Sequence, residues 1–180
     1  MVRITVRNLQ KRVFAYPQKT RKSPSAISWR TMVWLPLAKA ITLSDFRSGT
    51  GKYKILSCTI KKLISKALKE EGVEKEGEIT ICFANDTLIR KLNARYLKKN
   101  KPTDVLTFDL TNFQDKRQLF ADIIISTDTA IRNARVFKTA PLYELSLYSI
   151  HGLLHLLGYD DHSEESRKIM RGKELKYVHT

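Results

Sequence analysis

The segment from His151 to His162, HGLLHLLGYDDH, constrains the fold of this chain more than any other stretch of its sequence. Two histidines four residues apart lie on one face of a helix, at a spacing that lets two imidazoles bind one metal ion. Gly158 follows three residues later and can end that helix in a left-handed conformation. Asp161 and His162 then come where a third ligand is needed. Three protein ligands with an open fourth position are typical of a catalytic zinc site.

The third ligand has two candidates. In sites with the spacing His-x3-His-x2-Gly-x2-ligand, the third ligand lies ten residues after the first histidine, and here that residue is Asp161. His162, one residue later, offers the nitrogen donor that zinc often prefers. Adjacent loop side chains point in different directions, so we expect only one of the two to bind directly. The predicted metal ligands are therefore His151, His155 and Asp161, with His162 as the alternative to Asp161.

Gly152 distinguishes this segment from the helix motif of metalloproteases. In His-Glu-x2-His enzymes the glutamate after the first histidine is the general base, and a glycine there can neither accept a proton nor orient a water. The glycine therefore speaks against peptide hydrolysis by that mechanism. A further expectation is that it leaves room for a bulky substrate near the metal.

Charge indicates the class of partner. The 180 residues include 33 Lys and Arg against 18 Asp and Glu, a net charge of +15, which suggests nucleic acid first and a membrane surface second. No apolar run reaches the ~18 residues of a transmembrane helix, and the first residues lack the apolar block of a signal peptide. Cys58 and Cys82 make no disulfide framework and are expected in the core, which favours a reducing cytoplasm.

The length predicts a single domain over residues 1–180. Its positive charge is concentrated in residues 1–53, which hold eleven basic residues and one acidic residue. The stretch 12–53 has no clean helical or strand period and contains several prolines and glycines. We interpret it as a basic, partly irregular insertion after the first strand.

Hydrophobic periodicity predicts a series of strands and helices along the rest of the chain. Strands are expected at 1–7, 78–84, 104–110 and 121–126, and helices at 57–72, 86–97, 128–137, 141–155 and after Ser163. On the last helix, Ile169, Met170 and Leu175 are expected to face inward. The alternation of strands and helices is typical of an α+β or α/β domain.

The sequence resembles the YbeY-type endoribonucleases, a family of bacterial rRNA maturation factors. The family signature is close to His-Gly-x-Leu-His-Leu-x-Gly-Tyr-Asp-His, and HGLLHLLGYDDH differs from it by an added acidic residue before the last histidine. Leu92–Tyr96 and Pro102–Phe108 match a second motif, Leu-Asn-x2-Tyr followed by Pro-Thr-Asp-Val-Leu-Ser-Phe. Ala121–Ser126 matches a third, Gly-Asp-Ile-x-Ile-Ser, with alanine in place of the glycine. The resemblance covers residues 54–180 and the opening strand.

The resemblance implies an α+β domain with a small mixed sheet of about four strands covered by about five helices, and a zinc-hydrolase-like site at a helix C-terminus. It implies one Zn²⁺ ion per chain, through which His151 and His155 act in catalysis. It further implies a cytoplasmic, single-strand-specific endoribonuclease that matures the 3′ end of 16S rRNA and acts in ribosome quality control. The implied partners are single-stranded RNA, rRNA and the small ribosomal subunit, with no membrane and no obligate protein partner.

Family members often carry an arginine associated with RNA binding after the tyrosine of the second motif, and here that residue is Leu97. Nearby basic residues can supply the charge, so the RNA-binding candidates are Arg95, Lys98, Lys99 and Lys101. Further candidates for holding the RNA backbone are Arg132, Arg135 and Lys138. The candidates for a general base are Asp104, Asp122 and Asp160.

Two other functions fit the same residues. One is a non-catalytic, ribosome-associated factor with a structural metal, which the missing glutamate and the missing arginine favour. The other is a metallohydrolase of peptides or small molecules, against which Gly152 and the positive charge argue.

Overall fold

The computed structural model describes residues 1–8, 51–111, 115 and 117–178. Along the chain, the elements of the described part are β1 (Val2–Asn8), α1 (Gly51–Glu70), β2 (Glu76–Ala84), α2 (Asp86–Leu97), β3 (Val105–Asp109), β4 (Gln118–Ser126), α3 (Thr127–Phe137), α4 (Pro141–Leu156) and α5 (Glu164–Val178). The strands form one sheet in the order β1-β2-β4-β3, in which β3 is antiparallel and the others are parallel. The predicted α+β fold with a small mixed sheet is therefore confirmed.

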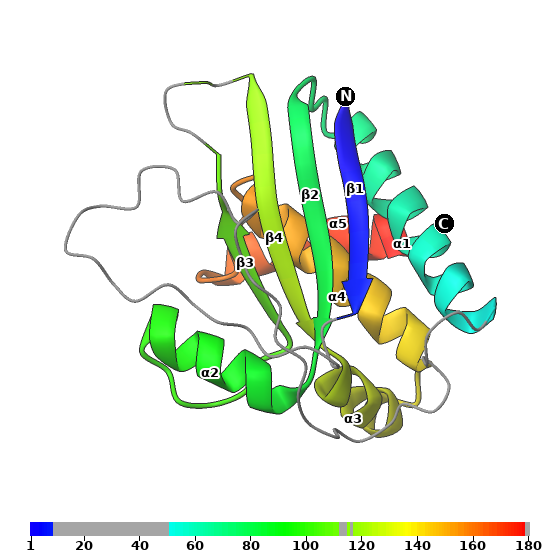
Figure 1. The fold of residues 1–180 in the computed structure, drawn as a ribbon, viewed down its shortest axis with the longest axis vertical. Coiled ribbons are helices and arrows are strands. Elements are labelled where there is room, and N and C mark those ends of the chain that lie inside the picture. The colour runs from blue at the N-terminus through cyan, green and yellow to red at the C-terminus, as the bar shows by residue number, and fades with distance from the viewer. Residues whose placement is uncertain (9–50, 112–114, 116, 179–180) are drawn as a thin grey trace.

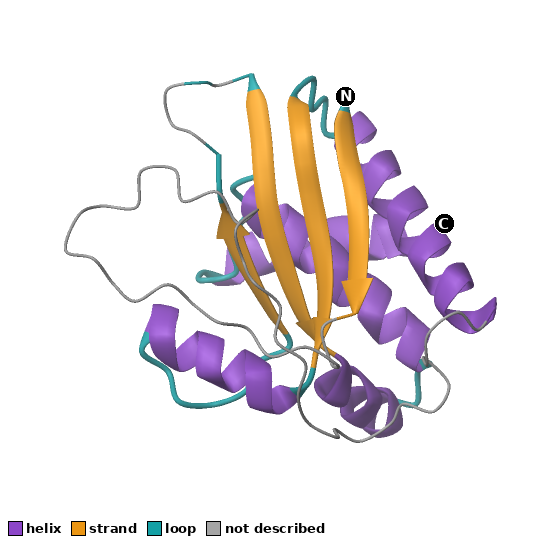
Figure 2. Ribbon diagram, viewed as in Figure 1, coloured by secondary structure: helices purple, strands orange, loops and turns teal. Residues whose placement is uncertain are grey.

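Three helices form a layer on one face of the sheet: α1 and α4 contact its strands, and α5 packs against these two helices (Figures 1 and 2). Alternate strand residues point to that face, where Ile79, Ile81 and Ile123 are buried against helix residues such as Ile60 and Leu153. α4 runs through the middle of this layer and contacts β3, β4, α1 and α5. The helix that carries both histidines is therefore held on several sides.

α2 packs against the opposite face of the sheet. Its Ile89 and Leu92 form a second, smaller core with Cys82, Leu106 and Ile124. α3 lies beside the end of the sheet and packs against α4 and α2 (Figure 1). Edge strand β3 consequently separates α2 on one face from α4 on the other.

The predicted boundary that differs most from the structure is the start of the first helix after the insertion. α1 begins at Gly51 rather than at Ser57, so residues 51–53 of the predicted insertion belong to the first turn of this helix. The remainder of the predicted insertion, residues 12–50, lies outside the described residues. Within the described part of the chain, no helix combines the length and the apolar composition that a membrane crossing requires.

The prediction of which α5 residues face the core is only partly correct. Met170 is buried as expected, but Ile169 is 55% exposed and Leu175 is 39% exposed, so those two expectations are wrong. The residues that share the buried face with Met170 are Glu174 and Tyr177, four and seven positions later. A glutamate on the inner face breaks the apolar pattern on which the prediction rested.

The two cysteines also differ from each other. Cys82 is buried in the second core, and burial raises the pKa of its thiol to about 12. Cys58 is exposed on α1, so the expectation that it lies in the core is wrong.

Candidate metal centre

The C-terminal end of α4 sets the geometry of the histidine pair. The helix begins at Pro141, as predicted, and places His151 and His155 in its last two turns. After the helix, Gly158 adopts a φ of 93°, and its N–H donates to the carbonyl of His155. The next N–H, of Tyr159, donates to the carbonyl of Leu154 at 3.0 Å. These two bonds are those of a helix end closed by a left-handed glycine, which confirms the role predicted for Gly158.

The two imidazoles face each other with one nitrogen each. Their Nε2 atoms lie 3.0 Å apart. Nδ1 of His155 lies 3.0 Å from the carbonyl oxygen of Tyr159, which can only accept, so Nδ1 carries the proton. Nδ1 of His151 lies 2.7 Å from Oε1 of Glu174, and donation to this carboxylate fixes the same tautomer. In the neutral rings both Nε2 lone pairs therefore point at one place, where a proton or a metal cation is needed.

Asp161 joins the histidine pair from the loop after α4. One ligand atom from each of His151, His155 and Asp161 lies within 4.8 Å of the other two. Two nitrogens bound to one tetrahedral zinc at about 2.0–2.1 Å lie about 3.3 Å apart, which is close to the separation of the two Nε2 atoms. The negative end of the α4 dipole also favours a cation here. The three side chains, which we call the metal triad, thus fit a divalent metal ion.

His162 lies outside the metal triad. Its side chain is 91% exposed, and its Nδ1 is 3.9 Å from Oδ1 of Asp161. The backbone N–H of His162 donates to Oδ1 of Asp160 at 3.1 Å, a hydrogen bond within the loop. The structure brings Asp161 rather than His162 to the histidine pair, and direct ligation by Asp161 stays a prediction.

Glu174 is a component of the site that the sequence did not predict. It is only 6% exposed and reaches His151 from α5, the next helix along the chain. Burial by itself lowers the pKa of His151, but the hydrogen bond and the negative charge of Glu174 outweigh it and raise that pKa. The charges of Asp104 and Asp161 act in the same direction. The sequence did offer one signal for this role: Glu174 lies four residues after Met170 and three before Tyr177, on the same helix face as these two buried residues.

Gly152 packs directly against the sheet. It is buried, and its carbonyl accepts a hydrogen bond from the Thr107 hydroxyl of β3 at 3.0 Å. A Cβ added at Gly152 would lie 2.6 Å from a side-chain methyl of Ile123 and 3.0 Å from a methyl of Val105. The expectation that this glycine leaves room for a substrate is therefore wrong, because its space is filled by the sheet. The same contacts leave no room for the glutamate of a metalloprotease motif.

We expect Gly152→Ala to lower the free energy of unfolding by about 1–3 kcal/mol, because a methyl group forced into a packed interface displaces its neighbours. Urea unfolding monitored by circular dichroism measures this change. Gly172→Ala is the matched control, since a Cβ there meets no atom within 4 Å, and it should stabilise α5 by up to about 1 kcal/mol. Equal effects of the two substitutions would contradict the packing argument.

The three candidate bases occupy different surroundings. Asp104 lies just before β3, where its Oδ1 accepts from the N–H of Val105, and its charge acts on His151. Asp122 lies on β4 between two residues of the main core, so it points to the opposite face, and burial raises its pKa. Asp160 is exposed, and a hydrogen bond from Ser166 lowers its pKa. Of the three, Asp122 is the one that the sheet separates from the metal triad.

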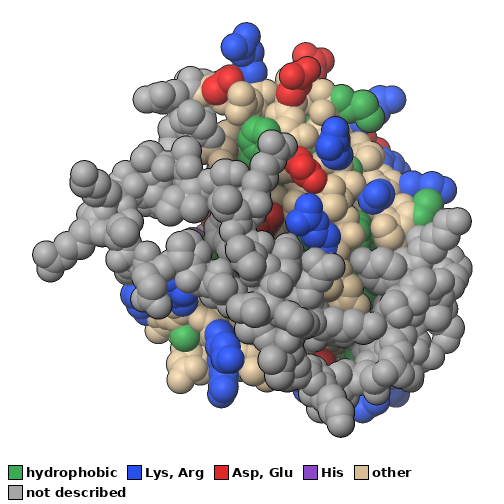
Figure 3. All heavy atoms as spheres, in the orientation of Figure 1, with side chains coloured by type: hydrophobic (Ala, Val, Ile, Leu, Met, Phe, Trp, Pro, Cys, Tyr) green, Lys and Arg blue, Asp and Glu red, His purple; other side chains and the backbone are tan. Residues whose placement is uncertain are grey.

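The basic candidates for RNA binding gather at the end of α2 and in the loop after it. Lys98 caps this helix in a left-handed conformation with a φ of 61°, and it is exposed together with Lys99 and Lys101. Lys and Arg side chains also appear over several other elements on the face shown in Figure 3. The α2 candidates lie on the face of the sheet opposite α4. Their role in RNA binding stays a prediction.

The candidates on α3 are arranged differently. Arg132 forms an ion pair with Asp86 at 2.9 Å, and this contact ties α3 to the start of α2. Arg135 and Lys138 are exposed near the C-terminal end of α3. Arg132 therefore has a structural partner that an RNA phosphate would have to displace.

The fold and the site together define a small α+β protein with a candidate metal centre of two imidazoles and one carboxylate. A family model described as Endoribonuclease YbeY matches residues 46–180. Proteins named Endoribonuclease YbeY from Pelotomaculum thermopropionicum and Desulforamulus reducens are 32% and 36% identical to this chain. Those alignments cover 74% and 75% of this chain and 91% and 92% of the relatives. The chain belongs to the YbeY endoribonuclease family, which confirms the resemblance in its sequence motifs.

A solved structure is also similar. The solution structure of TM1509 from Thermotoga maritima is 28% identical, and the match covers 73% of this chain and 83% of that chain with a TM-score of 0.48.

Proposed function

We propose that this chain hydrolyses phosphodiester bonds of single-stranded RNA at a zinc site formed by His151, His155 and Asp161. Membership of the YbeY endoribonuclease family supports the reaction class. The observation that carries the proposal is the convergence of both Nε2 atoms and the Asp161 carboxylate on one place at the end of α4.

The residues of the site have separate tasks. When bound, the metal lowers the pKa of a water towards neutrality and polarises the scissile phosphate. Glu174 and the Tyr159 carbonyl hold the two rings in the tautomer that leaves each Nε2 free to bind a metal. Asp104 is the favoured general base, because its charge already acts on His151 and both hydrogen bonds that described residues donate to its carboxylate fall on Oδ1. Its Oδ2 is then available to take a proton from the attacking water.

The biological task that we propose is maturation of the 3′ end of 16S rRNA and ribosome quality control, in the cytoplasm and on the small ribosomal subunit. Two features support an RNA partner of this kind: the family of the chain and its net charge of +15. The negative charge of an RNA backbone makes binding to such a protein strongly dependent on salt.

Removing the metal tests the proposed reaction. The purified protein should cleave a single-stranded RNA, lose cleavage on treatment with a chelator, and regain it when zinc is added back. A duplex of the same sequence is the control substrate and should be cut much more slowly. Circular dichroism of the chelated protein should show an intact fold, because α4 is held by the core rather than by the metal.

The outcome of the same experiment separates the alternative functions. A protein that melts on chelation and never cleaves RNA would be a binding factor with a structural metal. Hydrolysis of casein or of small esters in place of RNA would identify another metallohydrolase. Cleavage that persists in metal-free protein would contradict the proposal outright.

A further inference from the structure

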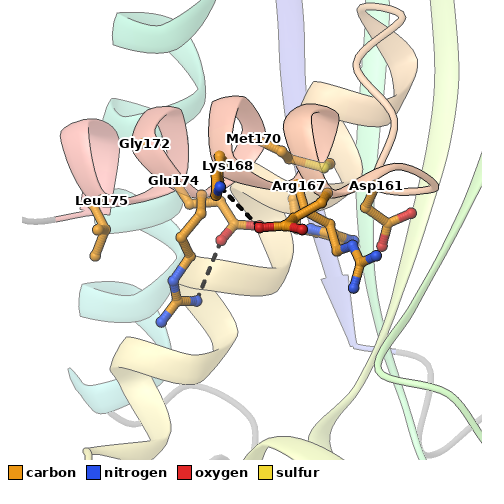
Figure 4. Close-up of a pocket in the computed structure, with 10 residues that line it drawn as sticks. Asp161, Arg167, Lys168, Met170, Gly172, Glu174 and Leu175 are labelled. Atoms are coloured by element: carbon orange, nitrogen blue, oxygen red, sulfur yellow. Dashed lines mark hydrogen bonds and ion pairs between the residues drawn. The ribbon is translucent and has the colours of Figure 1, made fainter.

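A pocket of about 620 Å³ opens beside the metal triad, and α5 forms most of its wall (Figure 4). Two members of the metal triad, His151 and Asp161, form part of the pocket lining. The remaining lining residues belong to α5, among them Glu164, Arg167, Lys168, Arg171 and Glu174. A ligand that reaches the metal triad through this pocket must therefore pass charged side chains of α5.

Most of these charges already have partners. The Glu174 carboxylate binds His151 through Oε1 and lies 3.4 Å from Arg171 through Oε2. Lys168 and Glu164 form an ion pair at 2.8 Å, one turn apart on the helix. Asp161 belongs to the metal triad, so its charge is offset when a divalent cation is bound. The carboxylates of the pocket consequently do not neutralise every cation in it.

Arg167 is the cation that remains. Within the described part of the chain it forms no ion pair, and the single hydrogen bond of its side chain runs from Nε to the carbonyl of Ser163 at 3.2 Å. That bond holds the base of the guanidinium against the first turn of α5 and leaves the four Nη–H donors to other acceptors. The planar fork of a guanidinium matches two oxygens of one phosphate, which a lysine ammonium does not.

We propose that Arg167 binds a backbone phosphate of single-stranded RNA in the α5 pocket, next to the metal triad. This inference rests on the proposed nuclease function and identifies where the substrate lies. A bound metal and Arg167 would give the pocket net positive charge, which attracts a phosphodiester. Such a contact holds the strand on the α4 side of the sheet, whereas the α2 lysines lie on the other side.

The test compares RNA binding by three charge variants of the zinc-loaded protein. Arg167→Gln removes the guanidinium, Arg167→Lys keeps the charge without the fork, and Lys62→Gln removes an exposed cation from α1, away from the pocket. The probe is a fluorescent, hydrolysis-resistant phosphorothioate single strand, and anisotropy gives Kd over a range of salt concentrations. Zinc content is measured on every variant.

Arg167→Gln should weaken binding by about fivefold at moderate salt and reduce the slope of log K against log salt by about 0.7. Arg167→Lys should keep the slope and lose part of the affinity, while Lys62→Gln should match the wild type. The proposal is overturned if Arg167→Gln binds as Lys62→Gln does, although wild-type cleavage would then still support the nuclease. It is also overturned if both Arg167 variants lose zinc, because the role would then be structural. A wild-type protein that neither binds nor cleaves RNA overturns both proposals.

Discussion

Asp161→Ala should lower the affinity of the metal triad for zinc by more than about 100-fold, whereas His162→Ala should leave it nearly unchanged. The Asp161 carboxylate lies within 4.8 Å of the ligand nitrogens of both histidines, while the His162 side chain is 91% exposed. Loss of a direct ligand should exceed the 10–100-fold cost that is typical of losing a hydrogen-bond partner behind a ligand. Cleavage of RNA should fall in parallel with metal content in the Asp161 variant only.

Competition with a chromophoric chelator gives the zinc affinity of each variant, and the two neighbouring substitutions control for each other. Each substitution removes one potential ligand from the same loop after α4, a carboxylate in Asp161→Ala and an imidazole in His162→Ala. A His162→Ala protein that loses zinc, paired with an Asp161→Ala protein that keeps it, would move the third ligand one residue along the chain. Asp161→His tests ligation at this position directly, since an imidazole that replaces the carboxylate as a ligand should retain the metal.

The sequence predicts the elements of this fold well because each carries its own local pattern. Glu78–Ala84 alternates as a strand, and Pro141 and Gly158 mark the two ends of α4. The strand order could not be read in the same way, because the placement of β4 between β2 and β3 depends on contacts between distant segments. The error on α5 has a similar origin, since the burial of Glu174 depends on a histidine of another helix.

The same distinction applies to the site. The spacing of His151 and His155 is a property of one helix, so it predicts their common face from sequence alone. Glu174 contacts His151 because α5 packs against α4, and the charge of Asp104 acts on His151 because β3 packs against α4. A local pattern therefore finds the pair that faces the metal, and the packed fold supplies the groups that orient that pair.

Glu174→Gln should weaken zinc binding by about 10–100-fold, which is the usual cost of removing a carboxylate that orients a metal-binding histidine. The carboxylate accepts from Nδ1 of His151 at 2.7 Å, which makes Nε2 both correctly aimed and more basic. An amide keeps an acceptor oxygen but loses the charge, and it can also turn its NH₂ group towards the ring. Glu174→Ala should cost more than Glu174→Gln, because it leaves a buried Nδ1–H without a partner.

Glu164→Gln is the matched control for this substitution, because it removes a carboxylate from the same pocket wall without touching His151. Zinc affinity and the urea unfolding of metal-free protein are measured on both variants. If Glu174 positions His151, zinc affinity falls in Glu174→Gln beyond any loss of stability and is unchanged in Glu164→Gln. A Glu174→Gln protein that is less stable but binds zinc as tightly as the wild type would show that the glutamate only joins α5 to α4.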